Sequence, residues 1–273
     1  MSFALPVVDV NVHVFPWPFR HLPASSPRQL ARELRAQTVR TAWVGSFESV
    51  LHRDIDGVNR RLTDVCRDHG SQAPTKEQTV WLPFGTVHPG LPDWREDLRR
   101  CHEQYRMKGI RLYPNYHQYR LDSRPARELL TECARRGLIV QIVLSLEDTR
   151  TQHPLVRVSP VDPQSLMPAV QRLPRLPIVL LNSFRETPTG KLESLCRAGR
   201  VYVELATLER AAGLERLLTT IPADRICYGS NVPLYYPSAA RLKLNSAQIG
   251  QLQRKQIASE NAESLLRTGR NGK

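Results

Sequence analysis

The chain has 273 residues, of which 41% are hydrophobic and 24% are charged. This composition is that of an ordinary globular protein and excludes a disordered or fibrous one. The 39 basic and 26 acidic residues give a net charge of +13. Because the basic residues are scattered in runs of no more than two, without a basic tail or arm, we expect no nucleic-acid partner.

Cysteine usage and the N-terminal sequence indicate the compartment. The five cysteines lie far apart and form no Cys-x-x-Cys pair, so we expect neither a disulfide framework nor a zinc ribbon. The first residues lack a basic region and are interrupted by Pro6 and Asp9, unlike a signal peptide. No apolar run approaches the ~20 residues of a membrane span. We therefore expect a cytoplasmic protein with no membrane partner.

Short aliphatic runs alternate along the chain with longer segments of helical apolar spacing, a pattern typical of a parallel α/β fold. The predicted strands are 7–13, 39–45, 80–87, 109–114, 138–145, 178–182, 201–205 and 226–229. The predicted helices are 27–36, 53–66, 93–106, 125–136, 163–172, 191–198, 208–218 and 246–266. The length alone also allows two domains. Eight strand and helix units instead predict one (β/α)8 TIM barrel, a single domain over residues 1–273.

Strand alternation predicts which side chains face the barrel axis. In the first strand we expect the valines to face the helices, and Asp9, Asn11 and His13 to face inward. The side chains expected to face inward from later strands, or to end them on the inner side, are Arg111, Tyr113, Gln141, Val143, Ser145, Asn182, Tyr202, Glu204 and Asn231. Catalytic residues of TIM barrels lie at the C-terminal ends of the strands, so this polar end is the candidate site. A purely structural ion network of Asp9, Arg111 and Glu204 is the alternative.

Several segments also match a family pattern in order and spacing. They are VVDVNVHVF, MKGIRLYPNY, GLIVQIVLS, LPIVLLNSF, VYVELA, PADRICYGSNVPL and ASENAESLL. On these segments the chain resembles the amidohydrolase-related metal-dependent hydrolases of the amidohydrolase superfamily, particularly the branch that contains decarboxylases and lactone hydrolases. The resemblance covers essentially the whole chain. It implies a TIM barrel and a hydrolase or decarboxylase acting on a small anionic or cyclic substrate.

The resemblance further implies a divalent metal, bound by two histidines of the first strand, by histidines after strands five and six, and by an aspartate after strand eight. In this chain those positions are Asn11, His13, Val143, Asn182 and Asn231. The lysine that some relatives use to bridge two metals falls on Arg111.

One histidine is too few for a zinc site, and neutral amides give a divalent ion no charge compensation. We therefore expect no metal and no other cofactor. A relocated site, in which His88, His117 or His153 approaches His13, is the alternative.

Two functions are compatible with these residues. The favoured one is a metal-independent enzyme in which His13 is the acid or base, Arg111 binds a substrate carboxylate or enolate, and Glu204 orients one of them. The residues expected to contact a small anionic ligand at the barrel mouth are Asp9, Asn11, Tyr113, Gln141, Asn182 and Asn231. The other function is that of a non-catalytic pseudoenzyme that binds a small molecule or a protein. A homo-oligomer is left open.

Overall fold

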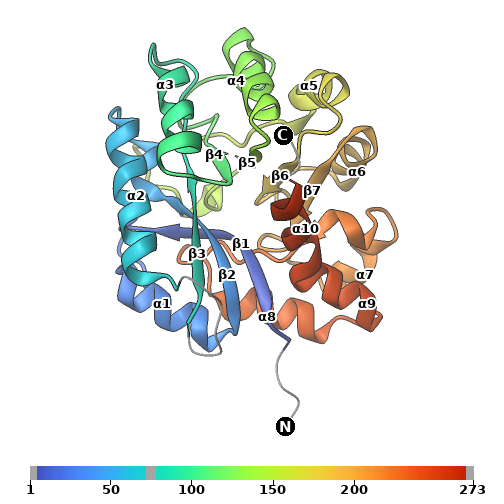
Figure 1. Ribbon diagram of the computed structural model, residues 1–273. Helices are drawn as coiled ribbons and strands as arrows, with labels where there is room; N and C mark the ends of the chain where they lie inside the picture. The colour runs from blue at the N-terminus through green and yellow to red at the C-terminus, as the bar shows by residue number, and fades with distance from the viewer. Residues whose placement is uncertain (1–4, 72–77, 269–273) are drawn as a thin grey trace.

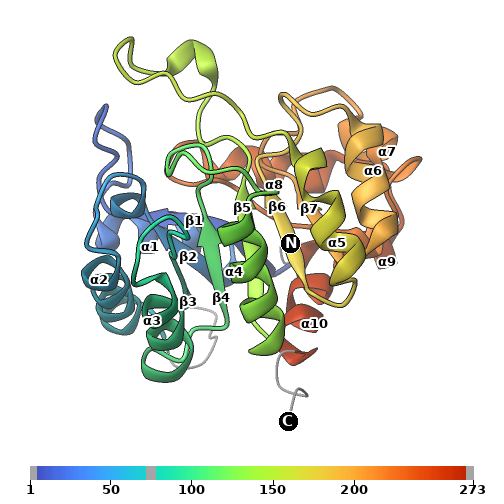
Figure 2. The same cartoon turned by 90° about the horizontal axis from the view of Figure 1, so that it is seen from above.

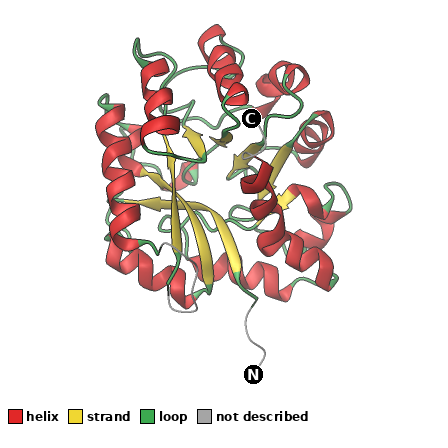
Figure 3. Cartoon of the chain, in the orientation of Figure 1, coloured by secondary structure: helices red, strands yellow, loops and turns green. Residues whose placement is uncertain are grey.

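The computed structural model describes residues 5–71 and 78–268. Eight parallel strands pair in chain order, and helices cover the outside of the sheet (Figure 1, Figure 3). The strands are β1 (Val7–Val14), β2 (Val39–Ser46), β3 (Val80–Gly85), β4 (Gly109–Leu112), β5 (Ile139–Val143), β6 (Ile178–Leu181), β7 (Val201–Glu204) and β8 (Ile226–Cys227). The predicted single-domain (β/α)8 TIM barrel is confirmed.

The helices largely follow the predicted segments. They are α1 (Pro27–Ala36), α2 (Ile55–His69), α3 (Trp94–Arg99), α4 (Arg124–Arg135), α5 (Met167–Arg172), α6 (Thr189–Ala198), α7 (Gly213–Leu218), α8 (Pro237–Ser246), α9 (Gln251–Lys255) and α10 (Asn261–Thr268). Helix α1 begins at a capping box in which the Ser26 hydroxyl accepts from the N–H of Gln29. The predicted helix over 246–266 is wrong at its start, because α8 ends at Ser246 and α9 begins only at Gln251.

The barrel closes between β1 and the segment that follows β8. One bridge joins Val12 to Val232. The N–H of His13 donates to the carbonyl of Val232 at 2.9 Å, and the N–H of Asn231 donates to the carbonyl of Asn11 at 2.8 Å. The residues that follow β8 therefore lie directly against the end of β1.

Two apolar layers hold the fold together, one between the strands and the helices and one inside the barrel. Val8 and Val10 belong to the inner layer, with Val143 and Val179, whereas Val12 belongs to the outer one. The expectation that every valine of β1 faces the helices is thus wrong for Val8 and Val10. The reason is a β-bulge, because the register between β1 and β2 shifts between Asp9 and Val12.

Long connections lie at the C-terminal ends of the strands. Figure 2 shows the yellow-green segment between β5 and α5 projecting beyond the barrel, at the end opposite α10. All five cysteines are buried and free. None of the helices in the described part of the chain is long and apolar enough to cross a membrane.

Candidate active site

Polar side chains at the ends of three strands, β1, β6 and β7, meet inside the barrel, and all of them are buried. Asn11 donates from Nδ2 to Oδ1 of Asn182 at 2.8 Å and to Oε1 of Glu204 at 3.2 Å. Glu204 Oε1 also accepts from the N–H of Asn182 at 2.7 Å, and its Oε2 accepts from the N–H of Ala206. Burial raises the pKa of Glu204, while these donors oppose the shift. The carboxyl of Glu204 thus fixes the amides of β1 and β6 relative to each other.

Two of the asparagines also have a backbone role. Asn182 and Asn231 both have a φ of 57°, in the left-handed region that asparagine tolerates better than most residues. The side chain of Asn182 donates to the carbonyl of Ser145 at 2.7 Å, and that of Asn231 donates to the carbonyl of Leu146 at 3.0 Å. Both residues therefore tie the end of their own strand to the loop after β5.

Asp9 lies apart from this group. Because Val8 and Val10 pack inside the barrel, Asp9 between them lies on the opposite face of β1, which differs from its expected inward orientation. Its Oδ1 accepts from the N–H of Asn11 at 3.0 Å and from the N–H of Ser230 at 3.1 Å. Burial raises the pKa of Asp9 to about 7. Asp9 therefore supports the junction between β1 and β8.

The guanidinium of Arg111 lies fully buried inside the barrel, as expected from strand alternation. Nε donates to Gln141 Oε1 at 2.8 Å. Nη1 donates to the carbonyl of Val12 at 2.8 Å and to His13 Nε2 at 3.1 Å. Nη2 donates to the carbonyls of Val10 at 3.2 Å and Trp43 at 3.0 Å. A guanidinium has five N–H donors, and all five are used here. Binding of a ligand carboxylate by Arg111 would require one of these bonds to break.

Gln141 and Tyr113 also make contacts inside the barrel. Gln141 accepts from Arg111 and donates from Nε2 to the carbonyl of Val10 at 2.6 Å. The ring of Tyr113 lies 6.3 Å from that of His13, and its hydroxyl donates to the carbonyl of Ser46 at 3.4 Å. Both predicted ligand contacts therefore already have protein partners.

The ring of His13 is held from two sides. It stacks on Phe47, with ring centroids 4.7 Å apart and the planes 3° from parallel. Its Nε2 faces Nη1 of Arg111 at 3.1 Å. Burial, together with the charge of Arg111, lowers the pKa of His13 well below its usual value. His13 is therefore a neutral imidazole at pH 7.

Several polar atoms at this end of the barrel are buried without a hydrogen-bond partner in the described part of the chain, and three of them belong to β1 and to the segment that follows β8. These three are Oδ1 of Asn11, Nδ1 of His13 and Oδ1 of Asn231. Native proteins satisfy the large majority of buried polar atoms, so each exception needs an explanation. These three come from neighbouring positions, because Asn11 and Asn231 are joined through their backbones.

The divalent metal implied by the family resemblance does not fit these residues. The lone pair of His13 Nε2 accepts from a permanently charged guanidinium, and the orphaned oxygens of Asn11 and Asn231 carry no negative charge. Within residues 5–71 and 78–268, no group of three or more His, Cys, Asp or Glu side chains is placed to hold a metal ion.

The three loop histidines do not rebuild such a site. His88 and His117 stack on each other, with centroids 4.4 Å apart, and Nε2 of His117 lies 2.7 Å from the carbonyl of Ser49. His153 is exposed and accepts from the N–H of Leu155.

A cover of aromatic and charged side chains closes the barrel mouth. Trp17, from the loop between β1 and α1, packs on Phe47 with ring centroids 5.0 Å apart. From the same loop, Arg20 forms a 2.5 Å ion pair with the buried Glu147, which follows β5. Burial raises the pKa of Glu147, and Arg20 opposes the shift. Trp17, Phe47 and Glu147 were not among the site residues predicted from the sequence. The Pro-rich stretch after the first strand was the one available signal, since loops at that end of a barrel often cover a site.

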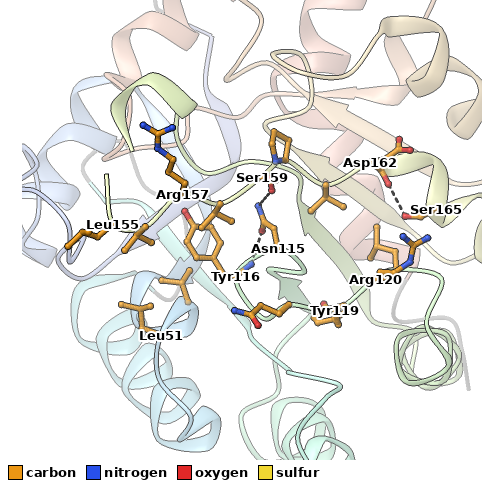
Figure 4. A pocket seen from close by; sticks show the side chains of 17 residues that line it. Leu51, Asn115, Tyr116, Tyr119, Arg120, Leu155, Arg157, Ser159, Asp162 and Ser165 are labelled. Carbon is orange, nitrogen blue, oxygen red and sulfur yellow. Dashed lines mark hydrogen bonds between the residues drawn. The ribbon is translucent and has the colours of Figure 1, made fainter. Parts of the chain in front are cut away.

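A groove of about 680 Å³ lies outside this cover (Figure 4). It runs between the loop after β4, with Asn115 and Tyr116, and the loop after β5, with Leu155 and Ser159. Nδ2 of Asn115 donates to the carbonyl of Ser159 at 3.1 Å and joins the two loops. The Tyr116 ring also lies 6.2 Å from that of Trp17, so the groove and the cover share a wall.

Comparison with known proteins identifies the family. The sequence model of the amidohydrolase family matches residues 81–268, and the chain belongs to that family. This confirms the resemblance inferred from the sequence. No curated protein matches the chain.

Solved structures of low sequence identity share the fold. A 2,6-dihydroxybenzoate decarboxylase from Rhizobium is 16% identical, with a TM-score of 0.71 over 96% of this chain and 98% of that one. A 5-carboxyvanillate decarboxylase from Sphingomonas paucimobilis is 12% identical, with a TM-score of 0.72 over 96% and 99%. A dihydroxybenzoic acid decarboxylase from Polaromonas, with bound manganese and 2-nitroresorcinol, is 14% identical, with a TM-score of 0.70 over 96% and 97%.

Proposed function

We propose that the chain is a metal-independent hydrolase or carboxy-lyase that acts on a small anionic or cyclic substrate at the closed end of the barrel. The observation that carries this proposal is the group of three orphaned polar atoms on Asn11, His13 and Asn231. One N–H donor and two carbonyl acceptors would receive a substrate that carries an electron-rich oxygen beside hydroxyl or amide donors.

His13 is the proposed catalytic residue. Its Nε2 faces a donor, so the proton of the neutral ring lies on Nδ1, the atom that has no protein partner. This differs from the acid or base role expected from the sequence, because Nδ1 of this tautomer has no lone pair to accept a proton. In hydrolysis negative charge develops on the carbonyl oxygen, and in decarboxylation the electrons of the broken C–CO2 bond are delocalised onto an oxygen conjugated with that carbon. A neutral imidazole N–H in a dry site would stabilise that charge.

The other residues hold this arrangement. Glu204 orients the amide of Asn11 and leaves its Oδ1 free to accept a hydrogen bond. The decarboxylases that share the fold support the substrate class, because their structures hold oxygen-substituted aromatic rings, 2,6-dihydroxybenzoate in one case and 2-nitroresorcinol in another. The manganese of the Polaromonas enzyme has no counterpart in this proposal, since the residues of this chain do not fit a metal.

Substrate access requires movement of the cover. His13 and Asn11 are fully buried, and Trp17 and the Arg20–Glu147 pair lie over the mouth. The groove beside Tyr116 is the proposed approach route, because it shares a wall with the cover and has a volume suited to a small ligand.

Substrate turnover tests the proposal directly. Chelator-treated protein would be incubated with hydroxybenzoates and aryl lactones, and substrate loss followed by liquid chromatography. His13→Phe keeps a ring to stack on Phe47 but removes both nitrogens, and we expect a loss of about 100-fold or more, as for an oxyanion donor. His52→Gln, at an exposed histidine, is the matched control. Activity that requires added manganese, unchanged activity in His13→Phe, or ligand binding without any turnover would each overturn the proposal.

A further inference from the structure

The hydrogen bond between Arg111 and His13 determines which ring nitrogen of His13 carries the proton. A guanidinium carries only donors and stays charged at all physiological pH values. The 3.1 Å contact between Arg111 Nη1 and His13 Nε2 therefore requires His13 to accept through Nε2. The other four donors of Arg111 are bound to the carbonyls of Val10, Val12 and Trp43 and to Gln141, so the guanidinium cannot turn away without leaving acceptors unpaired.

The position of this guanidinium is fixed by the barrel wall. Arg111 comes from β4, and its carbonyl acceptors belong to β1 and β2, on the other side of β3 in strand order. Gly45 leaves the space that the guanidinium fills, since a Cβ atom there would lie 2.6 Å from Nη1. The side chain is thus a fixed internal cation and has no donor left for a ligand.

We propose that Arg111 is a positioning residue, which orients His13 at this end of the barrel as a bound metal ion would orient it. It holds His13 with Nε2 unprotonated and directs the Nδ1–H toward the ligand. This inference rests on the proposed function only for its consequence in catalysis. The tautomer itself is measurable without turnover.

Ring-nitrogen NMR of protein with ¹⁵N-labelled histidine tests the assignment. In the wild type we expect His13 to carry its proton on Nδ1 and to show an unprotonated Nε2. Arg111→Lys keeps a cationic donor and should retain this tautomer. Arg111→Met removes the donor and should give the tautomer mixture of an ordinary histidine. The exposed His21 and His52 serve as internal controls whose signals should not change.

Kinetic measurements separate positioning from mere stability. In Arg111→Met we expect kcat to fall at least about tenfold with little change in KM, and Arg111→Lys to restore most of it. If Arg111→Met does not fold, Gly45→Ala provides the second test, because it displaces the guanidinium without removing it. A wild-type His13 protonated on Nε2, or an unchanged tautomer in a folded variant whose guanidinium is absent or displaced, would overturn the proposal. Failure of the proposed function would appear instead as absent turnover with the expected tautomer intact.

Discussion

A Cβ atom on Gly45 would lie 2.6 Å from Nη1 of Arg111 and 2.9 Å from its Cδ and Cζ atoms. The glycine of β2 and the arginine of β4 are therefore complementary in shape. Neither backbone strain nor a turn explains this glycine, because it lies in a regular strand between buried residues.

This relationship predicts the effect of Gly45→Ala. The added methyl would push a buried, fully bonded guanidinium, and we expect the free energy of unfolding to fall by about 1–3 kcal/mol, the usual cost of overpacking. Gly190→Ala is the matched control, because nothing lies within 4 Å of its Cβ position and alanine favours a helix such as α6. Urea unfolding of both variants would test this. Equal stability of the two would show that Arg111 moves freely.

The buried carboxyl of Asp9 predicts that the difference in stability between the wild type and Asp9→Asn depends on pH. Burial raises its pKa from 3.8 to about 7 in the folded chain, so between these values the folded state holds a proton that the unfolded state has lost. The stability contributed by this proton is full below pH 4 and is lost as the pH rises through 7. In Asp9→Asn, whose Oδ1 can keep both backbone hydrogen bonds, this loss is absent.

We therefore expect the free energy of unfolding of Asp9→Asn, measured relative to that of the wild type, to be about 2–4 kcal/mol higher at pH 8 than at pH 5. Urea unfolding at these two pH values measures the change. Asp68→Asn, at an exposed position, should show no such trend. A difference between Asp9→Asn and wild type that stays constant with pH would mean that Asp9 is ionised throughout the range.

The cover over the mouth predicts a fluorescence change. Arg20→Gln removes the cation that pairs with the buried Glu147, which should loosen the loop that carries Trp17. We expect acrylamide to quench tryptophan emission more strongly in this variant, and the increase to vanish when Trp17→Phe is added. Arg28→Gln, at an exposed arginine of α1, is the control. Quenching identical to that of the control would show that the ion pair does not hold the cover, as is common for partly exposed pairs.

Metal removal should have no effect. Since the residues at the barrel end do not fit a divalent ion, dialysis against a chelator should leave the unfolding midpoint unchanged. Elemental analysis of the purified protein should find no stoichiometric zinc, manganese or iron. About one equivalent that resists dialysis, with a lower midpoint after its removal, would contradict this prediction.

The eight strands could be predicted from the sequence because each is a short apolar run with a clear boundary. The inward orientation of Arg111 and Glu204 followed from simple alternation. That rule failed at Val8 and Val10, because the bulge in β1 adds a residue that no composition signal marks. The hydrogen-bond partners of Arg111 could not be predicted from the sequence either, because three of its five acceptors are backbone carbonyls, which every residue carries. The cover was missed because Trp17 and Glu147 are distant in sequence and meet only through the fold.

The buried arginine also constrains how this chain can change over evolutionary time. Introducing histidine at position 11 or 143 would leave the guanidinium, and its charge, next to His13. Replacing Arg111 first would remove the guanidinium donors of Gln141, of His13 and of the carbonyls of Val12 and Trp43, at a cost of several kcal/mol. Each single step toward a metal site is therefore unfavourable by itself. Substitutions in the loops at the barrel mouth do not disturb these buried bonds, so the loops can vary far more easily than the centre of the barrel.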